Sequence, residues 1–152
     1  MLTSQEVLDL IPQQPPFRFV DRLVRLDETG AVGEYTFRVD ETFYEGHFPG
    51  NPVTPGVILL EAMCQTGLVA LGIYLLGLEL PREEVAESIT LFTDAEVEFS
   101  RVVLPESTVR ITAERIFWRR RKLKSKVRLT LADGTFVAGG TVSGMGVPRE
   151  QI

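Results

Sequence analysis

The sequence predicts an α+β fold in which one antiparallel sheet of about six strands curls around a central, buried helix. The helix is indicated by a nearly continuous apolar run at residues 57–76. The strands are indicated by apolar and polar residues that alternate with a period of two at residues 109–114 and 127–131. An Asp-Gly pair at residues 133–134 is a strong hairpin signal. Periodicity alone does not define how the sheet wraps.

Length and composition fit one domain over residues 1–152. The chain has 44% hydrophobic residues, a share that suits a compact core. Its 16 basic and 21 acidic residues give a formal net charge of -5, which argues against nucleic acid as a partner. His47 is the only histidine and Cys64 the only cysteine. Sites with two imidazoles, disulfides and CxxC sites are therefore excluded, and we expect neither a metal nor a redox cofactor.

The first elements are a short helix and two strands. Thr3 is placed to cap the helix, and Glu6 completes a capping box. Strands are predicted at residues 17–26 and 31–39, with a turn at Glu28-Thr29-Gly30 between them. Residues 40–54 follow as a loop rich in glycine, proline and aromatic residues.

The buried helix is predicted from Gly56 to about Gly77. Pro55 precedes it, where a missing N–H is harmless, and Pro81 bars its continuation. The helix is long enough to span a bilayer, but Glu61 interrupts its first half and no basic anchors flank it. We therefore expect a helix wrapped by protein, and no membrane partner. The first ten residues carry no visible secretory signal, so a cytoplasmic location is expected.

Glu61 is a candidate catalytic acid. Its neighbours along the helix are apolar, and burial among them should raise the pKa of its carboxyl and favour the protonated form. Gln65 lies four residues further on, on the same face of the helix, and can hydrogen-bond that carboxyl.

His47 is the matching candidate base. It lies in the loop between Gly46 and Gly50, two glycines that let a ligand approach the backbone closely. A neutral imidazole and a neutral carboxylic acid that face one cavity can act as base and acid at the same pH. The free N–H groups at the helix start, at Gly56 and Val57, can hold a carbonyl oxygen as it becomes an oxyanion.

Each of these residues also has a purely structural interpretation. A lone histidine in a glycine-rich loop is often a surface residue, and a lone glutamate in a core helix is often a satisfied buried group. Cys64 is expected to be inert because its neighbours are apolar. Gly67 and Gly72 are expected to allow close packing of another backbone against the helix.

Residues 43–65, FYEGHFPGNPVTPGVILLEAMCQ, resemble the signature of the 3-hydroxyacyl-(acyl-carrier-protein) dehydratases of fatty acid synthesis, of the FabZ type. The likeness extends to IPQQPPFRFVDR at residues 11–22, and more loosely to residues 94–99 and 102–105. It therefore covers most of the chain. The resemblance implies a hotdog fold, in which a curved antiparallel sheet wraps a long helix, and a homodimer that often assembles into a trimer of dimers.

The resemblance also implies a role for each matching residue. His47 matches the catalytic histidine, Glu61 the catalytic acid, Gly56 the glycine whose amide polarises the thioester carbonyl, and Gln65 the glutamine that supports the acid. The family places each active site between two subunits, with the histidine of one facing the glutamate of the other. Glutamate at position 61 and glycine at position 46 resemble the dehydratases that do not also isomerise the double bond. The residues expected to line the substrate tunnel are Phe43, Tyr44, Phe48 and Pro55.

Charge along the chain is polarised. Nine of the 16 basic residues lie between Arg110 and Arg128, whereas residues 79–98 hold seven acidic residues and one basic residue. An acidic acyl carrier protein would be steered to a basic surface, so Arg119, Arg120, Arg121 and Lys122 are candidate docking residues. The alternative is an exposed strand protected by its charges against edge pairing. Glu106 and Ser107 depart from the Pro-Gly-Asp that family members commonly carry, so the carrier and the acyl chain length stay open.

Two other functions are compatible with the sequence. A hotdog thioesterase would hydrolyse the acyl thioester, and the signature at residues 43–65 makes this less favoured than dehydration. A non-catalytic acyl-binding protein would keep the fold and the tunnel but would not need His47, Glu61 and Gln65 together.

Overall fold

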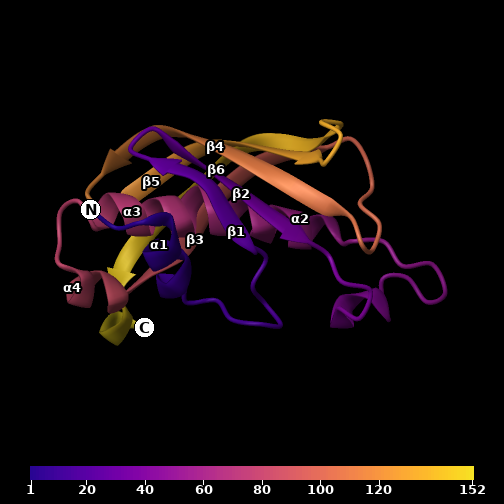
Figure 1. Ribbon diagram of the computed structural model, residues 1–152, viewed down its shortest axis with the longest axis horizontal. Helices are drawn as coiled ribbons and strands as arrows, with labels where there is room; N and C mark the ends of the chain where they lie inside the picture. Colours follow the sequence, from indigo (N-terminus) through magenta and orange to yellow (C-terminus); the bar gives the residue numbers. More distant parts are fainter.

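The computed structural model describes residues 1–152 and contains one six-stranded antiparallel sheet that curves around a long helix (Figure 1). The predicted α+β class and the hotdog architecture are confirmed. The strand order is β1-β2-β4-β5-β6-β3, so β1 and β3 are the two edges. The strands are β1 (Arg22–Asp27), β2 (Gly30–Thr36), β3 (Ser88–Phe99), β4 (Thr108–Arg119), β5 (Lys122–Leu131) and β6 (Phe136–Pro148).

The central helix has the predicted extent but not a uniform pitch. It runs as α2 (Gly56–Cys64), a π-helical segment η2 (Gln65–Ala70) and α3 (Leu71–Leu76). Every residue of η2 and α3 is buried. Gly56–Leu76 is also long and apolar enough to cross a membrane, but 67% of its most apolar window lies inside the protein. It is the core helix of this fold.

The first of the short elements, α1, packs near the end of the central helix. The capping box of α1 (Ser4–Leu10) is confirmed, because Thr3 Oγ1 accepts from the Glu6 N–H and Glu6 Oε2 accepts from the Thr3 N–H. Leu2 lies against Gly77 just after α3. The remaining short elements are η1 (Thr42–Tyr44), α4 (Arg82–Ala86) and η3 (Arg149–Gln151).

Two strand predictions need correction at their ends. The first strand was predicted from residue 17, but β1 begins at Arg22. The backbone of residues 17–19 is hydrogen-bonded to the side chain of Gln65 instead of to a neighbouring strand. The second strand was predicted to reach residue 39, and β2 ends at Thr36.

The two helix glycines behave differently. A Cβ on Gly67 would lie 2.8 Å from Val127 Cγ1 and 3.3 Å from Ala113 Cβ, so the sheet packs tightly there. The close packing predicted for Gly67 is present, although side chains and not a backbone make it. A Cβ on Gly72 would meet nothing nearer than Thr90 Oγ1 at 3.8 Å. The prediction of close packing is wrong for Gly72, which borders a cavity.

Candidate active site

The loop between β2 and α2 holds His47 through its own backbone. The His47 N–H donates to the Phe43 carbonyl at 3.1 Å, and the Val53 N–H donates to the His47 carbonyl at 2.9 Å. His47 Nδ1 lies 2.8 Å from the Val53 carbonyl oxygen. Because a carbonyl oxygen only accepts, Nδ1 carries the hydrogen and the lone pair of the neutral ring lies on Nε2. Nε2 is therefore the atom available to take a proton.

The same loop is closed by a buried hydroxyl pair. Tyr44 Oη and Thr54 Oγ1 lie 2.6 Å apart, and the Thr54 N–H donates to the Val103 carbonyl at 2.9 Å. These contacts fix the positions of Tyr44 and Thr54, which lie on either side of His47 in the loop. The ring of Phe48 stacks on the imidazole, with centroids 4.0 Å apart.

The residues predicted to line the tunnel are placed in different surroundings. Tyr44 and Pro55 are buried, Phe43 packs against the main core, and Phe48 is half-exposed. Their role along a substrate stays a prediction.

Gln65 is fully buried and joins Glu61 to the N-terminal segment. Its Nε2 donates to Glu61 Oε1 at 2.9 Å and to the Phe17 carbonyl at 3.0 Å, and its Oε1 accepts from the Phe19 N–H at 2.7 Å. The backbone groups leave only one orientation of the amide satisfied, with the NH₂ toward Glu61. Glu61 Oε1 is thereby fixed as an acceptor, and a proton on the carboxyl resides on Oε2.

The environment of Glu61 favours its neutral form. Burial raises the pKa of the Glu61 carboxyl above its usual value, and the hydrogen bond from Gln65 opposes part of that rise. A protonated Glu61 can donate a proton from Oε2 to a leaving group. Burial, and secondarily the nearby Glu61, also raises the pKa of the Cys64 thiol. That shift agrees with the inert thiol expected from the sequence.

The start of α2 presents two unpaired N–H groups. The N–H groups of Ile58 and Leu59 both donate to the Pro55 carbonyl, and they are the first in the helix to have an acceptor. The N–H groups of Gly56 and Val57 have no acceptor within the chain, and Val57 is 72% exposed. The ring of Phe99 lies 3.6 Å from where a Cβ of Gly56 would be. This open helix terminus can bind a carbonyl oxygen that gains negative charge.

Within one chain, Glu61 and Gln65 form one hydrogen-bonded group and His47 belongs to another. No hydrogen bond joins the imidazole to the carboxyl. Exposed apolar side chains surround the helix start and the adjoining loop; they are Phe48, Val57, Phe99, Val102 and Leu104. Such a patch is typical of a surface that another protein chain covers.

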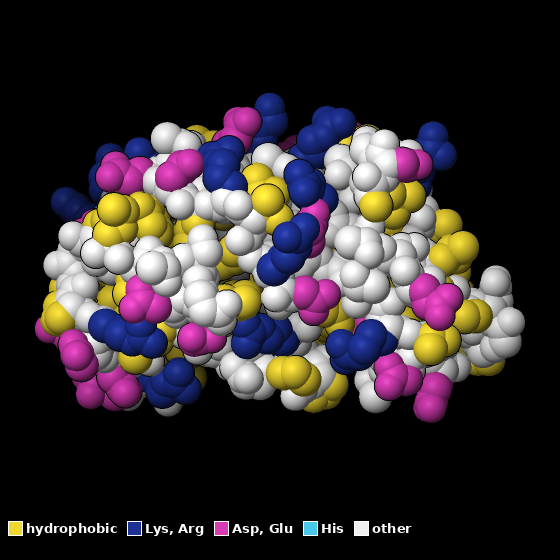
Figure 2. Space-filling view, in the orientation of Figure 1, with side chains coloured by type: hydrophobic (Ala, Val, Ile, Leu, Met, Phe, Trp, Pro, Cys, Tyr) yellow, Lys and Arg dark blue, Asp and Glu magenta, His cyan; other side chains and the backbone are white.

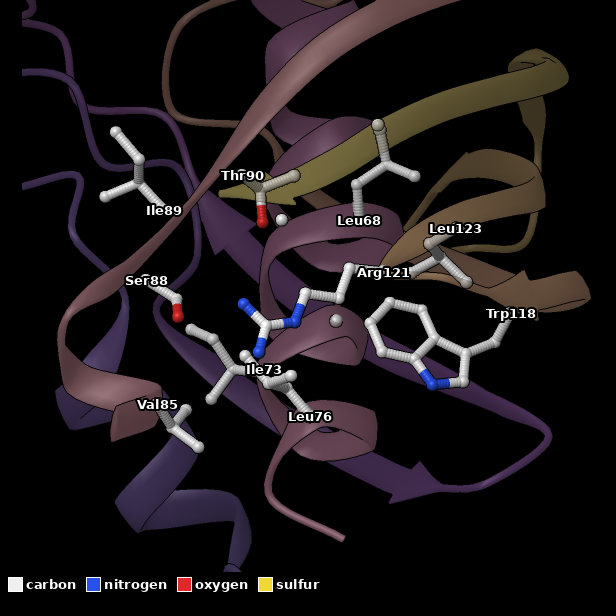
Figure 3. A pocket seen from close by; sticks show the side chains of 13 residues that line it. Leu68, Ile73, Leu76, Val85, Ser88, Ile89, Thr90, Trp118, Arg121 and Leu123 are labelled. Carbon is white, nitrogen blue, oxygen red and sulfur yellow. The ribbon is translucent and has the colours of Figure 1, made fainter. Parts of the chain in front are cut away.

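A cavity at the far end of the central helix was not predicted from the sequence. It is small, with a free volume of about 20 Å³ that would hold about one water molecule, and it lies between the helix and the sheet (Figure 3). Its walls are mostly apolar and include Leu68, Gly72, Ile73, Leu76, Trp118 and Leu123. Only Gly72, a small residue in an apolar helix, hinted at it, because the other walls come from strands distant in sequence.

The basic run 119–122 forms the turn between β4 and β5. Arg120 and Arg121 have φ of 51° and 62°, a left-handed pair that makes the turn tight. Arg119, Arg120 and Lys122 line a surface groove together with Phe117 and Met145. Arg121 differs, because its side chain lines the apolar cavity. In the view of Figure 2, Lys and Arg side chains follow the upper edge, over β4 and β5, and acidic side chains gather near α4 and the C-terminus.

Comparisons with known proteins show the family of this chain. The family model of the FabA-like domain matches residues 11–142. The 3-hydroxyacyl-(acyl-carrier-protein) dehydratase FabZ of Chloroflexus aggregans is 43% identical over 135 residues, which cover 88% of this chain and 88% of that protein. The FabZ dehydratase of Acetivibrio thermocellus is 38% identical over 144 residues, covering 93% and 92%.

Two solved structures share the fold at low sequence identity. The dehydratase heterocomplex ApeI:P from Xenorhabdus doucetiae has a TM-score of 0.75 at 13% identity and covers 95% of this chain and 92% of that chain. A hypothetical thioesterase with coenzyme A from Streptococcus pneumoniae has a TM-score of 0.53 at 11% identity, covering 84% and 85%. The hotdog architecture thus serves more than one reaction, and the site residues must decide between them.

Proposed function

The chain belongs to the FabA-like family and is a 3-hydroxyacyl-(acyl-carrier-protein) dehydratase of the FabZ type, and we propose that His47 is its base and Glu61 its acid. The observation that carries this assignment is the half-buried Glu61 carboxyl, with its raised pKa and its Oε1 held by Gln65. A hydro-lyase needs such an acid to turn a hydroxyl into a leaving water molecule.

The first step is removal of a proton from the carbon between the thioester and the hydroxyl-bearing carbon. His47 Nε2 takes this proton, since Nδ1 is engaged with Val53. The electron pair of the broken C–H bond moves toward the thioester carbonyl, whose oxygen gains negative charge. The N–H groups of Gly56 and Val57 stabilise that oxygen, a contribution of roughly 10²–10³ in rate for one such donor.

The second step is departure of water. Glu61 Oε2 protonates the 3-hydroxyl while its C–O bond breaks, and the carbon–carbon double bond of the 2-enoyl product forms. His47 is left protonated and Glu61 ionised, so transfer of one proton from the imidazole to the carboxylate restores both groups. All proton transfers are made by side chains of the protein.

The active site is proposed to form between two copies of the chain. His47 and Glu61 share no hydrogen bond within a protomer, and exposed apolar side chains surround the helix start. The long strand β3 is an unpaired edge of the sheet, with Leu91 and Phe92 exposed. A second copy paired along β3 would cover these surfaces and bring an imidazole to the other chain's carboxyl. Further assembly into a trimer of dimers belongs to the same proposal.

The partner that delivers the substrate is proposed to be an acidic acyl carrier protein. Arg119, Arg120 and Lys122 supply the complementary charge on one surface groove. This turn lies at the α3 end of its own protomer, opposite Gly56 (Figure 1). A two-fold partner with an antiparallel helix would bring its own turn toward the α2 end, where the thioester enters. The same proposal places the enzyme in the cytoplasm.

A thioesterase is the competing function for this fold. It would release a free thiol from an acyl thioester and would have no use for an acid aimed at a hydroxyl. Dehydration is favoured because burial raises the pKa of Glu61 and so favours the protonated carboxyl, while Gln65 holds Oε1 and leaves Oε2 to donate the proton.

The test is dehydration of 3-hydroxyacyl thioesters of an acyl carrier protein, and hydration of the 2-enoyl thioesters, by wild type, His47→Ala and Glu61→Gln. Each substitution should lower turnover by roughly 10²–10⁴. Wild-type turnover in both variants would show that the acid and base are assigned wrongly. Release of free thiol without formation of an enoyl product would identify a thioesterase.

A further inference from the structure

Glu41 is a buried carboxylate in the loop that carries His47. Its side chain is only 2% exposed, although the loop projects beyond the α2 end of the protomer (Figure 1). Glu41 precedes η1, but its side chain makes no hydrogen bond that caps this short helix. A buried charge that does not cap a helix needs another explanation.

The partners of the Glu41 carboxyl are Tyr35 and Arg38. Oε1 accepts from Tyr35 Oη at 2.8 Å, and Oε2 accepts from the Arg38 N–H at 3.3 Å. The Arg38 guanidinium lies 3.6 Å from Oε1, but its side chain is 54% exposed, so solvent weakens the attraction. Burial, and secondarily the hydrogen bond with Glu41, raises the pKa of the Tyr35 hydroxyl, which therefore stays a donor. The bond from Tyr35 is thus the contact that ties the Glu41 carboxyl to the sheet.

Tyr35 is a fixed point in the core. It lies in β2, is paired with Val109 of β4, and its side chain is fully buried. Its ring packs edge-on against the rings of Phe19 and Phe37, with centroids 5.5 and 4.9 Å away. A ring packed in this way holds its hydroxyl in one place, and the hydrogen bond to that hydroxyl fixes the position of Glu41.

Backbone hydrogen bonds connect Glu41 to His47. The Glu41 carbonyl accepts from the Tyr44 N–H at 3.2 Å, and the Phe43 carbonyl accepts from the His47 N–H at 3.1 Å. These two turns overlap, so we expect residues 41–47 to move as a unit. The other side of His47 is held separately, by Val53. Loss of the anchor at Glu41 should therefore shift the imidazole relative to Val53 and leave the sheet intact.

We propose that Glu41 is a positioning residue, which binds Tyr35 and thereby keeps the His47 imidazole in its place. The proposal rests on the proposed function, in which His47 is the base. A buried carboxylate adds little stability, because its desolvation offsets its hydrogen bonds, but those directional bonds specify one geometry. Geometry matters for catalysis, since displacement of a reacting group by about 1 Å can cost about 10²-fold in rate.

The first measurement is dehydration of the 3-hydroxyoctanoyl thioester of an acyl carrier protein. Tyr35→Phe and Glu41→Ala should each lower kcat by roughly 10–100-fold, with KM near the wild-type value. The double variant should be no slower than the slower single variant, because both substitutions break the same bond, and additive losses would contradict this. Glu41→Gln, whose amide oxygen can still accept from Tyr35, should recover most of the loss.

The second measurement observes the imidazole without substrate. His47 is the only histidine, so in the untagged chain its ring nitrogens give the only imidazole signals of a ¹H–¹⁵N spectrum. At about pH 8.5, where an imidazole is ordinarily neutral, the wild type should carry its hydrogen on Nδ1. Tyr35→Phe and Glu41→Ala should both increase the share of the tautomer with the hydrogen on Nε2.

Tyr74→Phe is the matched control. It removes another buried tyrosine hydroxyl, which donates to Met1 Sδ at the α3 end of the central helix. Its kcat and its tautomer should equal those of the wild type.

A wild-type kcat or a wild-type tautomer in Tyr35→Phe, or an equal change in Tyr74→Phe, would overturn the positioning role. Tyr35→Phe decides the question even if Glu41→Ala does not fold. Failure of the wild type to dehydrate the thioester counts against the proposed function instead, and the tautomer of His47 then still tests the effect of Glu41 on the imidazole.

Discussion

Gln65 is the residue whose hydrogen bonds orient Glu61, the proposed acid. Its amide is locked between Phe17, Phe19 and Glu61, so it donates to the carboxyl in one orientation only. A hydrogen bond donated to a carboxylate stabilises the ionised form, which is why this bond lowers the pKa of Glu61 against the effect of burial. In the proposed mechanism, Gln65 therefore keeps Glu61 a strong enough acid to give up its proton.

Gln65→Met should move the alkaline limb of the kcat/KM profile to higher pH. Without the donor, the pKa of Glu61 rises further and the carboxyl stays protonated over a wider range, while turnover falls because Glu61 is a weaker acid and less firmly held. The measurement is the pH dependence of dehydration by wild type and variant. A uniform loss at every pH, with an unmoved alkaline limb, would mean that Gln65 only supports packing.

Glu61→Gln should stabilise the protein while abolishing catalysis. Burial raises the pKa of Glu61 in the folded chain, so folding takes up a proton between the usual glutamate pKa and the raised one. Wild-type stability then falls as the pH rises through that window, whereas a glutamine does not titrate. The advantage of the variant in urea unfolding should be large at about pH 8 and nearly absent near pH 4. An advantage that is equal at both values would contradict the pKa assignment.

At the scale of elements, the central helix was predictable because its apolar run is long and is bounded by Pro55 and Pro81. The π-helical segment at Gln65–Ala70 was not, because the apolar run has the same pattern on both sides of it; in the structure this segment is fully buried, and Gln65 at its start binds the backbone of residues 17–19. Those contacts also explain why β1 begins late. A side chain distant in sequence takes the hydrogen bonds that a strand neighbour would supply.

The bounds of strand β3 could not be predicted from the alternation of apolar and polar residues. It lies within the acidic stretch at residues 79–98, and most of its side chains are exposed in the single chain. A strand that keeps neither face buried shows no alternating pattern. The cavity next to it was likewise hidden, since its walls come from four strands and the helix.

Gly72→Ala should stabilise the protein by about 0.5–1 kcal/mol, since alanine costs less than glycine in a helix interior. The added Cβ would make ordinary contacts, 3.8 Å from Thr90 Oγ1 and 3.9 Å from Leu123 Cδ2. Gly67→Ala is the matched contrast and should destabilise by about 1–3 kcal/mol, because its Cβ would press on Val127. Thermal and urea unfolding measure both. Equal effects of the two substitutions would contradict the packing described for this helix.

At the scale of the whole molecule, the proposed active site needs two protomers. The free N–H groups of α2 and the ring of Phe48 lie on an exposed apolar surface, and β3 offers an unpaired edge of 12 residues. An edge of that length is usually covered or blunted in a stable protein. The family signature predicts the residue types of the proposed site from the sequence, but a single chain does not show which protomer supplies each residue.

Complementation between inactive variants tests the shared active site most directly. His47→Ala and Glu61→Gln are each purified, mixed in equal amounts, unfolded together and refolded so that subunits exchange at random. A mixed dimer has one site with both substitutions and one intact site, so the mixture should recover roughly a quarter of wild-type dehydratase activity. Activity no higher than that of the separate variants, with mixed dimers present, would place both groups in one chain and contradict the account.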